Sequence, residues 1–175
     1  MNAAEKLCLS CGMCCDGSLF DNVRLGGDED PEYFKTLGLP VKRSRAKLPI
    51  AFVRQPCPAL CGDCTCRIYE DRPHQCRSFE CGVFKDASSG KITYESAHRS
   101  VVTGRRKAEK VKQLLRMLGE TEDTLSVGAR FRRVQRQVSA GGLDADAGEH
   151  FAALGLAMHK LDLFAHQKFY TAEVE

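Results

Sequence analysis

Four cysteines fall within eight residues near the start of the chain, and this segment constrains the fold more than any other. It reads Cys8-Leu9-Ser10-Cys11-Gly12-Met13-Cys14-Cys15. A C-x2-C-x2-C spacing lets one turning stretch of backbone aim three sulfurs at a metal, so a fourth ligand must come from elsewhere. Cys15 is a poor fourth ligand because neighbouring side chains usually point apart. We therefore expect two metal centres at Cys14 and Cys15, or one ligand beside one free thiol.

A second group of cysteines follows between residues 57 and 81, in C-P, C-x2-C and C-x-C spacings. Its members are Cys57, Cys61, Cys64, Cys66, Cys76 and Cys81. Pro58 and Pro73 fix the local backbone and favour turns that present a sulfur inward. His74 lies among these cysteines as a candidate ligand or hydrogen-bond donor. Three arginines, Arg67, Arg72 and Arg77, either offset the negative charge of metal-bound thiolates or lie on the surface.

Ten cysteines in 175 residues call for a chemical reason. The sequence shows no secretory signal and no apolar run of the roughly 20 residues that span a bilayer, so we expect a cytoplasmic protein with reduced thiols. Metal ligation is then favoured over a disulfide framework. Because no cysteine follows residue 81, we expect a cysteine-cluster module, residues 1–98, and a three-helix part, residues 99–175, packed as one unit.

The first half carries many turn-forming residues, which predict irregular structure with short elements. Residues 30–38 predict a short helix, with Asp30 as its cap and Pro31 in its first turn. Residues 50–53 predict a strand that leads into the second group of cysteines. Residues 83–94 predict a small hairpin around a turn rich in serine and glycine.

Three amphipathic helices are predicted in the second half, at residues 100–118, 123–139 and 145–169. Apolar residues recur along each at helical spacing, and glycines at 119 and 141–142 mark the first two ends. The apolar faces are Val111, Leu114, Leu115 and Leu118, then Val127, Phe131, Val134 and Val138, then Phe151, Leu154, Met158, Leu161 and Ala165. We therefore expect a small, mainly α single domain with few short strands, whose irregular first half is held together by metal.

Two separated motifs in a fixed order carry a family resemblance over roughly residues 8–80. They are Cys8-x2-Cys11-Gly12-x-Cys14-Cys15, and Cys57-Pro58 followed by Cys66-x-Ile68-Tyr69-Glu70-x-Arg72-Pro73-x2-Cys76-Arg77-x-Phe79. This pattern resembles the YkgJ-like cysteine-cluster family, which is described as zinc- or iron-chelating. The resemblance implies metal binding through Cys8, Cys11, Cys14, Cys15, Cys57, Cys66 and Cys76. Cys61, Cys64 and Cys81 are additions to the family pattern, which leaves the number of centres open.

Ligation by thiolates alone suits zinc and iron–sulfur clusters equally, and the sequence does not choose between them. A C-x2-C-x2-C motif with a remote Cys-Pro is similar to the ligand pattern of bacterial ferredoxins. Zinc would instead use pairs such as Cys8 with Cys11 and Cys61 with Cys64. Either two metals share a thiolate, or the chain supplies eight ligands by adding Cys81 or His74 to the seven.

The favoured function is a metal-binding protein with a structural, carrier or electron-transfer role, because no acid–base pair accompanies the cysteines at a telling spacing. The alternative is an iron–sulfur enzyme of methyl- or redox-transfer type. Cys57-x3-Cys61-x2-Cys64 matches the spacing of radical S-adenosylmethionine enzymes. However, only about 110 residues follow it, against the roughly 200 or more of a barrel.

Charge is concentrated in residues 99–136, which hold 11 lysines or arginines against 4 acidic residues. This basic stretch could contact phosphates, or it could pair with residues 137–175, which hold 2 basic and 6 acidic residues. No aromatic residues interleave it for base stacking. A nucleic-acid-binding zinc protein is thus the lesser alternative. We expect metal ions as the binding partners, allow for a protein partner and expect no membrane association.

Overall fold

The computed structural model describes residues 3–141 and 145–171 of the chain. The helices are α1 (Ala3–Cys11), α2 (Pro31–Thr36), α3 (His74–Ser78), α4 (Gly82–Ser88), α5 (Tyr94–Met117), α6 (Val127–Ser139) and α7 (Ala145–Lys168), and the strands are β1 (Asn22–Arg24), β2 (Val41–Arg43) and β3 (Ala51–Arg54). The prediction of a mainly α single domain with few short strands is confirmed.

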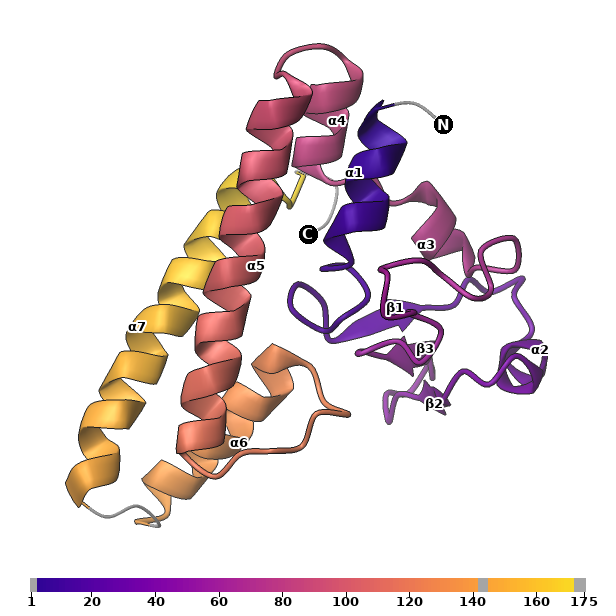
Figure 1. Ribbon diagram of the computed structural model, residues 1–175. Helices are drawn as coiled ribbons and strands as arrows, with labels where there is room; N and C mark the ends of the chain where they lie inside the picture. The colour runs from indigo at the N-terminus through magenta and orange to yellow at the C-terminus, as the bar shows by residue number, and fades with distance from the viewer. Residues whose placement is uncertain (1–2, 142–144, 172–175) are drawn as a thin grey trace.

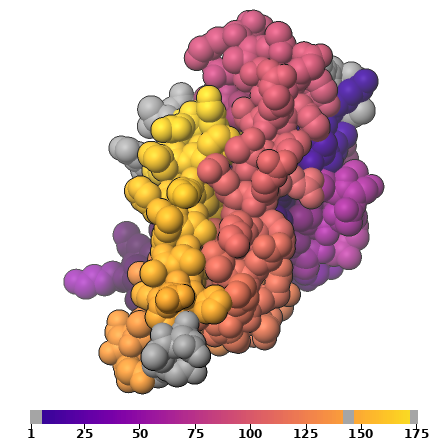
Figure 2. Space-filling model, turned by 60° about the vertical axis from the view of Figure 1, so that its left-hand side comes forward, coloured from indigo at the N-terminus to yellow at the C-terminus, as the bar shows by residue number. Residues whose placement is uncertain are grey.

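The two long helices α5 and α7 form the spine of the molecule. They run antiparallel side by side, and α6 packs against α5 near the end of α5 (Figure 1). Figure 2 shows α5 and α7 together covering one face of the molecule. The apolar faces predicted for these helices are buried in one core, where Val111, Leu115, Val134, Leu154 and Leu161 are at most 1% exposed. The helical periodicity of the sequence therefore identified this core correctly.

The larger core also takes in the start of the chain. Leu7 of α1 and Val83 of α4 are buried in the same cluster as the long helices. Accordingly, α1 packs against both α4 and α5, as Figure 1 shows at one end of α5. Part of the cysteine-rich half of the chain thus shares this larger core with the long helices.

A second, smaller core lies around the three-stranded sheet. The strands are antiparallel in the order β1-β3-β2, and Val53 of the central strand is paired with Val23 on one side and Val41 on the other. Leu25, Phe34, Leu39, Val53, Ala59 and Ile68 form this core. The predicted strand and the short helix are both present, because β3 covers 51–54 and Asp30 caps α2 by accepting a hydrogen bond from the Glu32 amide at 2.9 Å.

The hairpin predicted at residues 83–94 is wrong. Residues 82–88 form helix α4, and Tyr94 already opens α5. The Cys81 sulfur accepts a hydrogen bond from the Phe84 amide at 3.4 Å and so caps α4, while the Thr93 side chain caps α5 by accepting from the Ser96 amide. These caps satisfy backbone amides in the first turns of α4 and α5, where the hairpin prediction had placed strand residues.

The remaining differences concern where helices begin. Helix α5 starts six residues before the predicted residue 100, and α6 starts at Val127, because Ser126 caps it by accepting from the Ala129 amide at 3.1 Å. Gly119 and Gly141 have positive φ values of 78° and 75° just beyond the ends of α5 and α6, as predicted. Gly142 lies outside the described residues. The sequence interpretation also missed α1.

Backbone and side-chain contacts tie the first half of the chain to the helices. The Val127 amide donates to the carbonyl of Gly17 at 2.9 Å, and the Tyr170 hydroxyl donates to the carbonyl of Leu19 at 2.6 Å. At the far end of α7, the Gly82 amide donates to the Phe169 carbonyl at 3.0 Å. No helix in the described part of the chain combines the length and apolar character needed to cross a membrane.

Candidate metal centre

The cysteine-rich segment near the chain start is a helix end followed by a tight turn. Cys8 and Cys11 lie one turn apart at the end of α1. Gly12 then takes a φ of 67° and ends the helix, a conformation that glycine adopts without steric cost. Its carbonyl accepts from the amides of Cys15 and Asp16 at 2.9 and 3.0 Å, and this turn carries Cys14 and Cys15.

One set of four thiols, here called group one, gathers where α1 meets α4. It consists of Cys8, Cys11, Cys14 and Cys81. Burial raises the pKa of Cys8 to about 11, that of Cys11 to about 12 and that of Cys14 well above its usual value, and in each case the charge of Cys81 adds to the rise. Cys11, Cys14 and Cys81 also pack against the larger core. Electrostatics and packing therefore place these thiols together.

A second set, here called group two, consists of Cys15, Cys57, Cys66 and Cys76. Burial raises the pKa of Cys15 to about 12, and the charges of the other three members follow as the next causes. Burial likewise raises the pKa of Cys76 to about 12, with Cys57 and Cys66 as the next causes. Cys57 and Cys66 pack against the smaller core. Consecutive residues Cys14 and Cys15 thus belong to different groups.

The sheet and its following loops bring group two together. The Cys57 amide, just beyond β3, donates to the carbonyl of Cys15 at 2.7 Å. The chain then doubles back, because the Arg67 amide donates to the Ala59 carbonyl at 2.8 Å, and this places Cys66 near Cys57. Helix α3 presents Cys76, and its Gln75 side chain accepts from the Arg24 amide of β1 at 2.6 Å.

Backbone amides already point at three of the sulfurs. Hydrogen bonds from the backbone lower the pKa of Cys11, Cys57 and Cys81, in each case against a larger rise caused by burial. The donors include the Met13 amide for Cys11 and the Ala59 amide for Cys57. Such N–H donors stabilise a thiolate more than a thiol, and the thiolate is the form that binds a metal.

Two arginines lie near the groups as cations. Arg72 is close enough to lower the pKa of both Cys8 and Cys76, although burial raises both values overall, so it lies near a member of each group. Arg67 acts on Cys57 in the same sense, again against a net rise from burial. His74 is exposed at the start of α3, and its amide donates to Glu29 at 2.7 Å. The ring of His74 is not a main cause of any thiol pKa shift in the described residues.

The donor set suits a thiophilic metal, which the thiols would reach by rotation of their side chains. Within residues 3–141 and 145–171, no three histidine, cysteine, aspartate or glutamate side chains surround a position for a single ion. The thiols of each group are neighbours that must rotate inward to share an ion or a cluster. Those thiols whose pKa values are raised must also lose a proton on binding.

Cys61 and Cys64 belong to neither group. They lie on an exposed hairpin closed by the bridge between Leu60 and Cys66, and neither is a main cause of the pKa shifts in the grouped thiols. Neither group therefore includes the Cys61–Cys64 pair that the zinc interpretation used.

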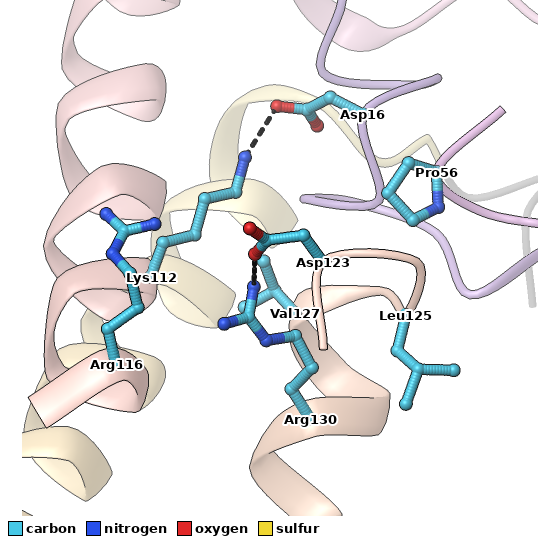
Figure 3. A pocket seen from close by; sticks show the side chains of 8 residues that line it. All are labelled: Asp16, Pro56, Lys112, Arg116, Asp123, Leu125, Val127 and Arg130. Carbon is cyan, nitrogen blue, oxygen red and sulfur yellow. Dashed lines mark hydrogen bonds and ion pairs between the residues drawn. The ribbon is translucent and has the colours of Figure 1, made fainter. Parts of the chain in front are cut away.

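A cavity of about 250 Å³ lies beside the turn that carries Cys15 (Figure 3). Helix α5, the loop after it and the start of α6 form most of its wall. Lys112 of α5 reaches across to Asp16 at 3.0 Å, and buried Arg130 of α6 pairs with Asp123 at 2.6 Å. Lys112 and Arg130 are thus paired with acids of the first half of the chain and of the α5–α6 loop, and Arg116 pairs with Glu109 of α5, which leaves less free charge for phosphates than the sequence indicates.

Sequence reasoning placed seven of the eight grouped thiols among the family ligands and ranked Cys81 with the additions. The structure sets Cys81 apart from Cys61 and Cys64, because α4 packs on α1 and brings Cys81 to Cys8 and Cys11. One signal was present in the sequence: eight thiols divide evenly into two sets of four, whereas seven do not.

Comparison with known proteins identifies the family of the chain. Residues 7–98 match the CxxCxxCC family, described as a putative zinc- or iron-chelating domain. That match covers both thiol groups and more than half of the chain. No curated protein and no solved structure matches the chain. The chain therefore belongs to the CxxCxxCC family.

Proposed function

We propose that the protein binds metal at two separate four-thiolate centres, one in group one and one in group two. The observation that carries this proposal is the division of Cys14 and Cys15. Each shares its strongest thiol neighbours with a different set, Cys14 with Cys81 and Cys11, and Cys15 with Cys76 and Cys57. Four thiolates complete the coordination of one zinc ion or of one iron–sulfur cluster.

The two groups differ in what holds them, which supports two centres rather than one large one. Group one rests on the larger core through Cys11, Cys14 and Cys81, and group two rests on the smaller core through Cys57 and Cys66. Arg72, which acts on a member of each group, supplies positive charge near both. That charge offsets part of the net negative charge of two four-thiolate centres.

The function of the two centres depends on whether they hold iron–sulfur clusters or zinc. Iron–sulfur clusters in both groups would lie next to one another along the backbone, since Cys14 and Cys15 are consecutive, and would suit electron transfer. Zinc in both groups would join the sheet region to the helices and act as a structural element or as cargo.

Anaerobic purification followed by metal analysis, sulfide analysis and an absorption spectrum tests the proposal. Two zinc-filled centres would give about two zinc ions per chain and no visible absorption. Two cubane clusters would give about eight irons, a matching amount of acid-labile sulfide, and a brown colour.

The stoichiometry distinguishes this proposal from a single centre. About one zinc ion or four irons per chain, unchanged when metal is supplied in excess, would mean that only one group binds. A protein that holds neither metal under these conditions would refute metal binding altogether.

A further inference from the structure

The hairpin that carries Cys61 and Cys64 is the one cysteine-bearing segment that the two proposed centres do not use. Its tip is a tight turn, in which the Cys64 amide donates to the Cys61 carbonyl at 3.0 Å and the Cys61 amide donates to the Thr65 carbonyl at 2.8 Å. Asp63 braces the turn by accepting from the Thr65 amide at 3.0 Å. The turn holds its two cysteines three residues apart, with Cys61 exposed and Cys64 partly buried.

Cys64 occupies a backbone position that suits glycine. Its φ is 67°, and no other non-glycine residue in the described chain has a positive φ. Hairpins that combine a type I turn with a left-handed residue usually place glycine there, because a side chain at that position is strained. Strain of this kind in a native structure points to a use for the side chain.

The sulfur of Cys64 lies against the turn between Cys11 and Cys14. A β-carbon added to Gly12 would lie 3.2 Å from this sulfur, so a side chain at position 12 would crowd it. Arg105 of α5 contacts both segments, because its guanidinium lies 3.8 Å from the Cys64 sulfur and 2.8 Å from the Ser10 carbonyl. The thiol therefore joins the exposed hairpin to the segment that carries members of both groups.

The base of the hairpin leads to group two. Cys66 follows Cys64 by two residues, and Leu60, its partner in the isolated bridge, follows Cys57 by three. Cys61 is exposed, whereas Cys57 and Cys66 are partly buried against the smaller core. Cys61 is therefore more accessible to a metal ion in solution than the partly buried thiols of group two.

We propose that Cys61 and Cys64 form an uptake dithiol, which captures a thiophilic metal ion from solution and passes it to the buried thiols without remaining a ligand. This inference rests on the proposed function. Each thiol that binds the ion releases one proton to the buffer. A bond from the metal to a buried sulfur then forms as that thiol loses its proton and a bond to Cys61 or Cys64 breaks, and the freed thiolate takes up a proton, so protons balance in the transfer. No oxidation state changes.

The test measures the rate at which reduced, metal-free protein takes up Zn²⁺ from a chromophoric chelator in a stopped-flow instrument. We expect the combined variant Cys61→Ser and Cys64→Ser to slow uptake by on the order of tenfold or more, because a hydroxyl is a far weaker zinc ligand than a thiolate. The final amount of zinc per chain should equal that of the wild type.

A matched pair of variants separates the thiol from the strain of the hairpin. Cys64→Gly relieves the left-handed conformation and Cys64→Ser keeps it, while both remove the sulfur. Similar slowing in both variants supports the proposal. Slowing in Cys64→Ser alone would assign the effect to the hairpin conformation and overturn it.

Two further outcomes would also overturn the proposal. An unchanged uptake rate in the combined variant would mean that metal reaches the buried thiols directly. A lower final zinc content would mean that Cys61 and Cys64 are permanent ligands. The final zinc content of the wild type reports separately on the proposed function, and a wild type that takes up no zinc would overturn both.

Discussion

The two cores of this molecule are stabilised in different ways. Among the described residues, the larger core joins 16 buried side chains, most of them from α1, α4 and the three long helices, whereas the smaller core around the sheet has six. Burial of a large aliphatic side chain contributes about 1.5–3 kcal/mol, so six such residues barely offset the entropy of ordering the loops around them. A region of this kind needs a covalent or metal link, and four thiols of group two lie beside it.

Metal removal should give the largest effect and should separate the two cores. A structural metal contributes on the order of 10 kcal/mol to folding, comparable to the stability of a whole small domain. We expect residues 15–76 to have lower amide protection in metal-free protein than in metal-loaded protein, while α5 and α7 keep theirs. Hydrogen exchange with and without a chelator measures this. Equal protection of the sheet in both forms would show that the smaller core is stable by itself.

The adjacent pair Cys14 and Cys15 offers a sharper form of the same comparison. Cys15→Ser should empty group two and reproduce the loss of protection in the sheet, whereas Cys14→Ser should empty group one and leave the sheet protected. Each variant should retain about half of the metal, since four thiolates complete one site. Metal analysis with hydrogen exchange checks both. Identical behaviour of the two variants would indicate one shared centre.

Matched leucine truncations test the cores without touching the thiols. Leu115 in the larger core and Leu39 in the smaller one are 0% and 3% exposed. Leu115→Ala should lower the free energy of unfolding by about 2–5 kcal/mol with or without metal. In metal-free protein, Leu39→Ala should leave the unfolding of the helices unchanged. Denaturant unfolding followed by helical circular dichroism provides the measurement, and a similar shift for Leu39→Ala would mean that the two cores unfold together.

The raised pKa values of group one predict a dependence on alkaline pH. Burial raises the pKa of Cys11 from 9.0 to about 12, so between these values the folded chain holds a proton that the unfolded chain releases. The free energy of unfolding of metal-free protein should therefore fall as pH rises above 9 until the folded form titrates as well. Denaturant midpoints at a series of pH values measure the slope. Cys11→Ala should make the slope shallower, and metal-loaded protein, whose bound thiolates have no protons left, should show little of it.

The ion pair between Lys112 and Asp16 should give the smallest effect. It joins α5 to the turn beside Cys15 at 3.0 Å, and both side chains are partly exposed, at 21% and 30%. We expect a coupling energy below about 1 kcal/mol in a double-mutant cycle of Lys112→Ala and Asp16→Asn. A larger value would mean that this contact, and not only metal, couples the two regions.

Local signals in the sequence were enough to predict the helical half. Apolar spacing located α5, α6 and α7, and glycines located the ends of the first two. The residues that cap these helices were harder to predict, because other polar residues lie close to Thr93, Ser126 and Cys81 in the sequence. Helix α1 was missed although its alanines and charged residues are good helix formers. Its cysteines were interpreted instead as part of a metal-binding loop.

The thiol grouping could be predicted only in part. The adjacency of Cys14 and Cys15 indicated two centres or one ligand beside a free thiol, since adjacent side chains diverge, and this needed no tertiary information. The place of Cys81 depends on the packing of α4 against α1, and the isolation of Cys61 depends on a hairpin whose left-handed residue is not glycine. Contacts between distant segments decide both, and local patterns do not record them.

The contact between Gly82 and the end of α7 has a consequence for the order of events on the ribosome. A β-carbon at Gly82 would lie 2.8 Å from the carbonyl oxygen of Lys168, so only glycine fits at this position. The residue immediately before it is Cys81. All of group two has been synthesised by residue 76, whereas the segment that presents Cys81 reaches its final position only after Phe169 has been added. Nascent chains can therefore bring group two together early, whereas the contact that fixes Gly82, next to Cys81, forms only after α7 has been synthesised.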